Sequence, residues 1–321
     1  MAGFLNVGCG ACLIVLALSA HAQQSYPNRP VRLILPLAPG GTTDIMARTV
    51  SPHLSAGLGQ SVIVENRTGA GGVVGADFVA KAPPDGYTLL LVSADTYTTN
   101  AVTYPKLPFD ARKDLKPVSI LAAGPSVLTV HPSLPVKTVK ELVALSKARP
   151  KDLNYGSGGT SGQLLVELVK LNTGMIVTNI PYKGSGPALI DQVAGHVQVG
   201  FFNIVATLPF IQSGRLRPLV VSGNKRSPKL PDVPSTSELN IKGFDEPGGH
   251  TIMVPGATPA EIVNRLHREL VKVMQVPEVG TRLTGEGAEV VANTPEQAAS
   301  IVNRSLDKWA DVVRRTGIKL E

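Results

Sequence analysis

The sequence has few cysteines, few aromatic residues and few charges. Both cysteines of the 321-residue chain, Cys9 and Cys12, lie in its first 22 residues, so the remainder cannot form a disulfide and must rely on ordinary hydrophobic cores. Aromatic residues make up only 4%, and Lys and Arg are dispersed, so the formal net charge of +7 does not predict nucleic-acid binding. With 43% hydrophobic and 17% charged residues, the composition excludes bulk disorder.

An apolar run near the N-terminus is too short to span a membrane. Residues 11–20 read ACLIVLALSA, whereas a spanning helix needs ~20 apolar residues. The run ends in Ala-His-Ala (20–22), with small residues at the two positions that signal peptidase requires. We therefore predict that residues 1–22 form a secretory signal peptide cleaved before Gln23. A membrane anchor and a lipoprotein acylated at Cys9 are the alternative interpretations.

Short β-branched runs alternate with helical patterns along the remaining chain. The predicted strands start at Val31, Val62, Thr88 and Val127, and the spacing of apolar residues predicts a helix over residues 44–58. Three helix starts carry a capping pattern, in which a side-chain oxygen accepts from a free amide of the first turn. They lie at Thr138, Thr258 and Thr294, the last two with proline at the first helical position.

This alternation predicts an α/β fold with mostly parallel sheets, in which ligands bind beyond the carboxyl ends of the strands. Boundaries near residue 124 and in the proline-rich stretch 227–234 predict two lobes, with the C-terminal third returning to the first lobe. Four segments that follow strands are rich in glycine and hydroxyl groups, and we interpret them as candidate ligand-binding loops. They are residues 36–44, 93–100, 156–162 and 181–187.

Glycine-rich loops that open helices offer backbone amides and the positive end of the helix dipole to an anion. Ser157, Thr160 and Ser161 precede an apolar helix and exceed what capping needs, so we expect some of them to contact a ligand. Two other residues have an equally simple structural explanation. Asp44 either contacts a ligand or does no more than cap its helix, and Lys183 is either an anion partner or a solvated surface residue.

The sequence predicts neither a catalytic residue nor a cofactor or metal. It has no G-x-S-x-G nucleophile elbow, and the chain beyond residue 22 has no cysteine. The glycine-rich stretch 69–75 differs from a Walker phosphate loop, and we interpret it as a tight turn before a helix packed closely on the sheet. The histidines beyond residue 22 are widely separated, without metal-ligand spacing, at His53, His131, His196, His250 and His267.

Several stretches match one known family in the same order along the chain. They include YPNRPVRLILPLAPGGTTDIMAR (26–48), LGQSVIVENRTGAGGVVGADFVAKAPPDGYTLL (58–90), LNYGSGG (153–159) and IPYKGSGPAL (180–189). The sequence closely resembles the Bug-type periplasmic solute-binding receptors of tripartite tricarboxylate transporter (TTT) systems over essentially the whole chain after the predicted signal.

The resemblance implies a two-lobed periplasmic binding protein of the Venus flytrap, type II-like class, with crossing strands between the lobes. Residues 23–124 are expected to form the first part of lobe 1 and residues 125–224 lobe 2, and residues 225–321 are expected to return to lobe 1. The implied ligand-binding residues are Leu37, Ala38, Gly40, Gly41, Thr42, Asp44, Ser93, Asn100, Ser157, Thr160, Ser161, Tyr182, Gly184, Ser185, Phe202 and Asn203.

The implied function is that of a monomeric periplasmic receptor, which captures a small carboxylate for uptake by a membrane permease. The expected ligand is a mono- or dicarboxylate, aromatic acids included. A receptor feeding a sensor system is the alternative, and a two-lobed secreted enzyme is a weaker one. Phe202 stands where the family often has Asp, and Gly248-Gly249 where it commonly has Ser-Trp. We therefore expect acids with an aliphatic or aromatic body to bind more tightly than polar polyacids.

Overall fold

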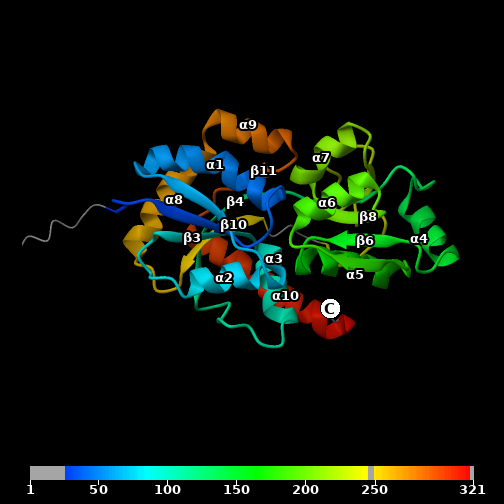
Figure 1. The fold of residues 1–321 in the computed structure, drawn as a ribbon, viewed down its shortest axis with the longest axis horizontal. Coiled ribbons are helices and arrows are strands. Elements are labelled where there is room, and N and C mark those ends of the chain that lie inside the picture. The colour runs from blue at the N-terminus through cyan, green and yellow to red at the C-terminus, as the bar shows by residue number, and fades with distance from the viewer. Residues whose placement is uncertain (1–25, 245–248, 319–321) are drawn as a thin grey trace, which may run out of the picture.

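The computed structural model describes residues 26–244 and 249–318, which form two α/β lobes side by side (Figure 1). Each lobe is built on one β-sheet covered by helices. The predicted signal peptide, residues 1–22, and Gly248 lie outside the described residues. Within the described part of the chain, no helix is both long and apolar enough to cross a membrane.

The first-lobe sheet consists, in spatial order, of β11 (Glu289–Val290), β4 (Leu115–Ala123), β10 (His250–Pro255), β3 (Thr88–Ser93), β1 (Val31–Leu35) and β2 (Val62–Asn66). β1 pairs in parallel with β2 and β3, whereas β10 is antiparallel to β3 and β4. The central strands are buried along their length because helices cover both faces of the sheet. All residues of β10, and all of β3 except Ser93, are buried.

The second-lobe sheet consists, in spatial order, of β7 (Thr178–Pro181), β6 (Asn154–Ser157), β8 (Val199–Asn203), β5 (Ser126–Val130) and β9 (Arg217–Val221). β6 pairs in parallel with β7 and β8, whereas β5 is antiparallel to β8 and β9. Both sheets are therefore mixed. The antiparallel strand is β10 in the first lobe and β5 in the second, and each follows a segment in which the chain crosses between the lobes.

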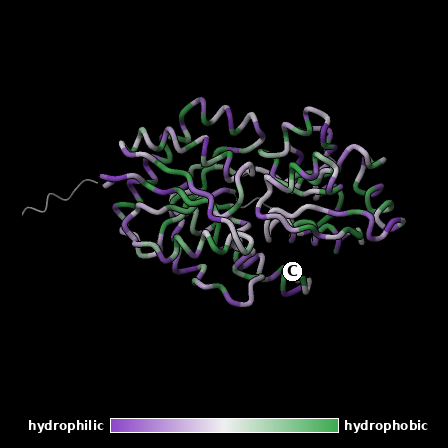
Figure 2. Tube along the Cα trace, in the orientation of Figure 1, coloured by the Kyte–Doolittle hydropathy of each residue, from purple (hydrophilic) through white to green (hydrophobic). Residues whose placement is uncertain are grey.

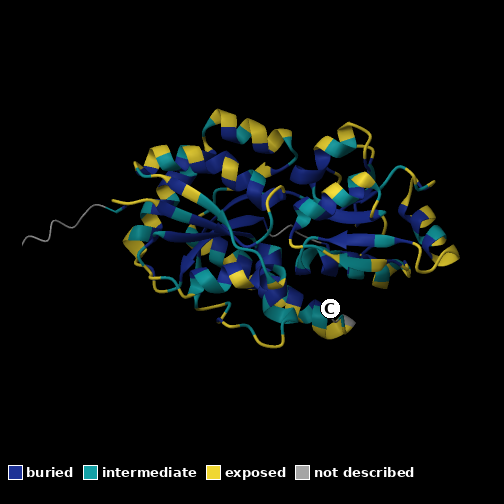
Figure 3. Ribbon diagram, viewed as in Figure 1, coloured by how far each residue is buried: buried dark blue, intermediate teal, exposed yellow. Residues whose placement is uncertain are grey.

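The helices of the first lobe are α1 (Thr42–Leu58), the short η1 (Ala70–Gly72), α2 (Val73–Ala80), α3 (Ala94–Thr103), α8 (Ala260–Met274) and α9 (Pro277–Gly285). Those of the second lobe are α4 (Val139–Ala148), α5 (Thr160–Thr173), α6 (Ser185–Ala194) and α7 (Ile204–Gln212). The C-terminal α10 (Pro295–Thr316) runs from the first lobe to beneath the second (Figure 1). The helices bury their inner faces and expose their outer faces (Figure 3).

The chain connects the lobes through short crossings and through packing of its C-terminal third. β4 ends at Ala123 and β5 begins at Ser126, so two residues make the first crossing. In the return from β9 to β10, Phe244 still belongs to the second-lobe core, and so do Trp309 and Val312 of α10. The C-terminal helix therefore packs against both lobes.

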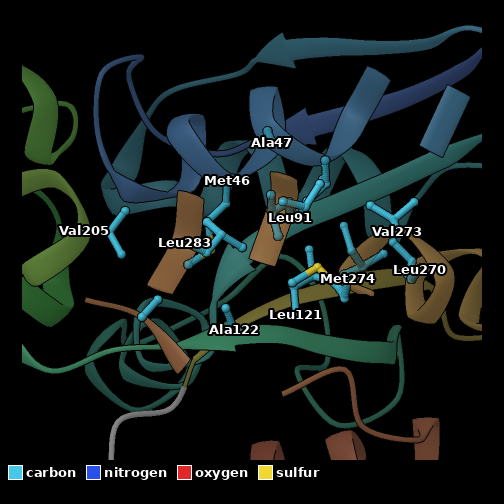
Figure 4. Close-up of a cluster of buried hydrophobic side chains, with 14 of the residues drawn as sticks. Met46, Ala47, Leu91, Leu121, Ala122, Val205, Leu270, Val273, Met274 and Leu283 are labelled. Carbon is cyan, nitrogen blue, oxygen red and sulfur yellow. The ribbon is translucent and has the colours of Figure 1, made fainter. Parts of the chain in front are cut away.

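The cores lie between sheets and helices, where the apolar stretches of the chain gather (Figure 2). In the first lobe, Met46 of α1, Leu91 of β3, Leu121 of β4, Leu270 of α8 and Leu283 of α9 meet, and all are fully buried (Figure 4). A separate core between β5, β6, β8 and α5 stabilises the second lobe. The first cluster also includes Val127, Val205 and Val221 of the second lobe, so apolar packing continues from one lobe to the other.

Two of the three predicted capping boxes are confirmed. The hydroxyls of Thr138 and Thr294 each accept a hydrogen bond from the amide three residues on, at 3.1 and 3.3 Å, and the reciprocal bond is present in both. The box at Thr258 is wrong. Pro259 is the N-cap and the helix begins at Ala260, so the spacing is shifted by one residue and the Thr258 hydroxyl has no partner among the described residues.

Two predictions about strand ends have different outcomes. The segment 93–100 is not a loop, because β3 leads directly into α3 at Ala94. The stretch 69–75 is a tight turn before a closely packed helix, as predicted. A methyl group at Gly75 would lie 2.8 Å from the Cα of Pro36, so only glycine allows α2 to approach the end of β1 this closely.

Candidate ligand-binding site

A cavity of about 100 Å³ lies between the two lobes. Its hydroxyl-bearing wall residues are Thr42, Thr43, Ser93, Thr96, Ser126, Ser161, Ser185 and Ser222. Its apolar side is formed by Leu37, Leu165, Phe201, Phe202, Phe244 and Trp309. Asn203 adds an amide, and Asp95, His250 and Lys308 are the titratable residues of the wall. Most of its polar lining therefore consists of uncharged hydrogen-bonding groups.

Four helices begin at this cavity without a side-chain cap. Their N-cap residues are Gly41 for α1, Ser93 for α3, Gly159 for α5 and Gly184 for α6, and none of them makes a side-chain capping hydrogen bond. Thr42, Ser161 and Ser185, in the first turns, lie on the cavity wall. Each start contributes a partial positive charge from its amides, which favours an anion at this point.

Glycines allow the two lobes to touch beside the cavity. The Ala38 N–H donates to the carbonyl oxygen of Lys183 at 2.9 Å, which joins the loop after β1 to the loop after β7. A methyl group at Gly184 would lie 2.8 Å from the Ala38 nitrogen, and one at Gly186 would overlap the carbonyl oxygen of Pro39. The structure is therefore a closed form in which backbone lies against backbone.

Hydroxyl groups continue this contact between α3 and α5. The Thr96 and Ser161 hydroxyls are 2.9 Å apart, and those of Thr99 and Thr160 are 3.1 Å apart. The Thr160 hydroxyl also donates to the side-chain oxygen of Asn100. These hydrogen bonds link the lobes directly and are available only while the lobes are closed.

Thirteen of the predicted site residues fall into two groups. Seven lie on the cavity wall, namely Leu37, Thr42, Ser93, Ser161, Ser185, Phe202 and Asn203. Ala38, Gly40, Gly41, Asn100, Thr160 and Gly184 instead lie at the contact between the lobes. Glycine and hydroxyl groups are needed both to bind a ligand and to let the lobes approach, so their presence in the sequence does not separate the two roles.

The three remaining predicted residues are not on the cavity wall, and two of them have side-chain partners of their own. The Asp44 carboxylate accepts from the Gly40 N–H at 3.1 Å and from Arg48 at 2.9 Å. Burial opposes its ionisation, but these hydrogen bonds outweigh burial and hold the pKa of Asp44 below its usual range. The Tyr182 hydroxyl donates to Asp191 at 2.7 Å, and burial followed by this contact raises its pKa to about 12. Ser157 is buried and is not on the wall.

Phe202 belongs both to the cavity wall and to a hydrophobic core. It contributes to the cavity wall, but it is 4% exposed and belongs to a small core with Ala188, Leu189, Ala206 and Leu216. Its neighbour along β8, Phe201, stacks on Phe244 with ring centroids 5.6 Å apart. The apolar side of the cavity therefore depends on residues from the return segment as well as on β8.

Sequence reasoning missed the wall residues that come from the C-terminal third of the chain. Phe244, His250, Lys308 and Trp309 reach the cavity through the return to the first lobe and through α10. No loop motif marks them, because their position depends on long-range packing. Asp95 lies inside the segment 93–100 and could have been selected from its place after a strand.

Of these residues, His250 has the most unusual environment. It is the first residue of β10, where it pairs with Ser93 of β3, and it is 4% exposed. Burial lowers its pKa from 6.5 to about 4, so the imidazole is neutral at neutral pH. Its Nδ1 has no hydrogen-bond partner within the described residues.

Two α/β lobes closed over a small, hydroxyl-lined cavity define a solute-binding protein. The model of the tripartite tricarboxylate transporter family receptor (TctC) matches residues 46–318, and the chain belongs to this family. BugT of Bordetella pertussis is 39% identical over 303 residues, which cover 94% of this chain and 93% of BugT. The predicted family and fold class are confirmed.

Solved structures agree with this assignment. The periplasmic binding protein BugD is similar with a TM-score of 0.87 and 30% identity, covering 92% of this chain and 100% of that one. MatC of Rhodopseudomonas palustris, solved with bound malate, gives a TM-score of 0.86 and 32% identity, covering 90% and 100%. The family and these structural neighbours are solute-binding receptors.

Proposed function

We propose that this protein binds a small mono- or dicarboxylate between its lobes and delivers it to the membrane permease of a tripartite tricarboxylate transporter. In this proposal residues 1–22 direct it to the periplasm and are removed. The observation that carries the proposal is the set of four uncapped helix starts, two from each lobe, around one cavity. The malate bound to MatC supports the same ligand class.

A carboxylate fits this lining better than a cation or a neutral solute does. Its two oxygens accept hydrogen bonds from the hydroxyl and amide donors that dominate the polar wall, and hydrogen bonds to a charged acceptor are stronger than neutral ones. Lys308 is the cationic wall residue and is half-buried, so neutral donors and helix dipoles supply most of the attraction.

A thermal-shift screen of C3–C8 aliphatic and aromatic carboxylates, followed by calorimetric titration of the acids that stabilise the protein, tests the proposal. A ligand present at 100 times its Kd should raise the free energy of unfolding by about 2.7 kcal/mol. Matched alcohols and amines of the same carbon skeletons serve as controls and should not stabilise the protein. If no carboxylate raises the melting temperature, the proposed ligand class is wrong.

The proposal includes a monomeric receptor that leaves its ligand chemically unchanged. Light scattering of the purified protein with and without ligand should give the mass of one chain. NMR of a carboxylate recovered after prolonged incubation with the protein should show the starting compound alone, and a converted product would favour the secreted-enzyme alternative. Loss of uptake, rather than loss of a transcriptional response, on deletion of the gene distinguishes a transport receptor from a sensor receptor.

A further inference from the structure

Three titratable side chains belong to the cavity wall, and two of them already have contacts. Asp95 accepts a hydrogen bond from the indole N–H of Trp309 at 3.4 Å. The Lys308 ammonium lies 5.2 Å from the Trp309 ring centroid, and Lys308 also borders a second hollow of about 460 Å³. His250 differs from both, because it is buried and its Nδ1 has no partner within the described residues.

The backbone around His250 is fixed by the sheet. His250 pairs with Ser93 of β3 and Ala122 of β4. The carbonyl oxygen of Gly249 accepts from the Ala94 N–H at 2.8 Å, and Gly249 has a φ of 71°, in the left-handed region that favours glycine. The imidazole is therefore held at the end of the sheet where α3 begins.

A buried imidazole nitrogen without a partner is costly in the free protein. The neutral ring has one donor and one acceptor nitrogen, so it can hydrogen-bond an oxygen as either donor or acceptor. The Phe201 and Phe244 rings on the apolar side of the cavity cannot supply such a bond. His250 lines the cavity, but this nitrogen has almost no accessible surface in the closed form, so a ligand group bonds it only when the wall around the ring adjusts.

We propose that His250 is a specificity-determining residue, which selects acids that carry a second oxygen-bearing group placed to hydrogen-bond its imidazole. The second group can be a hydroxyl, a carbonyl or a second carboxylate. This inference rests on the proposed function, in which the helix starts hold the first carboxylate. It also changes the expected ligand, since an apolar tail, which Phe202 suggested from the sequence, would offer the imidazole no hydrogen bond.

Two matched sets of acids test the inference by calorimetric titration. One set is butyrate, 4-hydroxybutyrate and succinate, and the other is hexanoate, 6-hydroxyhexanoate and adipate, so that only the far end changes within a set. In at least one set, the wild-type protein should bind the hydroxy acid or the diacid at least tenfold more tightly than the plain acid. Which of the two is preferred identifies the second group.

The same titrations on His250 variants test whether this residue causes the preference. His250→Leu should reduce the preference to less than threefold, mainly by weakening binding of the functionalised acid. His250→Asn keeps a hydrogen-bonding group close to the backbone and should retain part of the preference. Thr251→Val is the control, because Thr251 lies next to His250 on β10 but is not on the cavity wall, and its hydroxyl donates to Ser119 at 3.1 Å. It should keep the full wild-type preference.

A preference that survives in both His250 variants would overturn the inference while leaving the proposed function intact. Equal wild-type affinity for plain and functionalised acids in both sets would overturn it as well, even if His250→Leu does not fold. If wild-type protein binds no carboxylate in the wider C3–C8 screen, the proposed function fails first, so the two failures are distinguishable.

Discussion

A mutation of Gly186 should affect closure of the lobes over a ligand without destabilising the lobe to which Gly186 belongs. Gly186 lies in the first turn of α6, and three backbone atoms of the other lobe, from Pro39, Gly40 and Gly41, lie within 3.0 Å of where an added methyl group would be. Within its own lobe, Gly186→Ala replaces glycine in a helix, which should stabilise the fold by up to about 1 kcal/mol. Between the lobes, the new methyl group would overlap the Pro39 carbonyl oxygen in the closed form.

The expected loss of affinity follows from this overlap. Overpacking a rigid contact costs about 1–3 kcal/mol, and here the opposing atoms are backbone, which cannot rotate away. Since every 1.4 kcal/mol is tenfold in affinity, Gly186→Ala should weaken carboxylate binding roughly 5- to 150-fold. The separated lobes would also lose the Ala38–Lys183 hydrogen bond. The melting temperature without ligand should stay the same or rise.

Calorimetric titration and thermal unfolding of the same preparations measure the two effects. Gly280→Ala is the matched control, because Gly280 is a helical glycine of α9 whose added methyl group would find its nearest neighbour, the Met274 carbonyl oxygen, at 3.9 Å. It should gain similar stability without losing affinity. Wild-type affinity in Gly186→Ala would refute the conclusion that the ligand-bound protein closes as in this structure, and a lower melting temperature would show that Gly186 serves folding.

Three further predictions address the hydroxyl groups and His250. Ser161→Ala should weaken carboxylate binding about tenfold or more, since a hydrogen bond to a charged group contributes ~1.5–3 kcal/mol. The unliganded melting temperature should stay unchanged, because Gly159 rather than Ser161 is the N-cap of α5. A loss of stability with wild-type affinity would mean that Ser161 serves only the helix. Thr160→Val removes the hydroxyl that hydrogen-bonds to Thr99 and Asn100 across the lobes and should weaken carboxylate binding about fivefold. The control Thr173→Val, at the far end of α5, should not weaken it. Equal affinities of the two variants would contradict this prediction. Burial lowers the pKa of His250 from 6.5 to about 4, so between pH 6.5 and pH 4 this histidine is protonated in the unfolded chain but not in the folded protein. The free energy of unfolding should therefore fall as the pH drops through this range, and the contribution of His250 to that fall is about 3 kcal/mol. Denaturant unfolding across this range should show the slope in wild-type protein and a slope smaller by one proton in His250→Asn, and identical slopes would show that His250 does not titrate in this way.

Local patterns in the sequence were sufficient where the structure depends on neighbours in the chain. The capping boxes at Thr138 and Thr294 need only a hydroxyl and a Glu or Gln at the right spacing, and both formed. The pattern at Thr258 has the same letters, but the proline after it became the N-cap, because its ψ of 144° is extended rather than helical. A spacing rule cannot decide which side of the helix boundary a proline occupies.

The cavity wall depends on packing that no local pattern encodes. His250 is brought beside Ser93 by antiparallel pairing of strands more than 150 residues apart, and Trp309 reaches Asp95 across α10 and α3. The residues found from the sequence, such as Ser93 and Ser185, follow strands whose carboxyl ends meet at the site. The rule about strand ends thus finds the first half of the wall and misses the part built by the returning chain.

Closure and ligand charge are physically linked in this arrangement. α1 and α3 from one lobe, and α5 and α6 from the other, present their N-termini to the same small space. Each carries about half a positive charge, so closing the lobes over an empty cavity brings like charges together, while an anion at the centre turns this repulsion into attraction. A ligand shifts a conformational equilibrium only by its difference in affinity between the two states. A carboxylate has this difference, because only the closed form surrounds it with helix starts from both lobes, whereas a neutral solute of the same size does not.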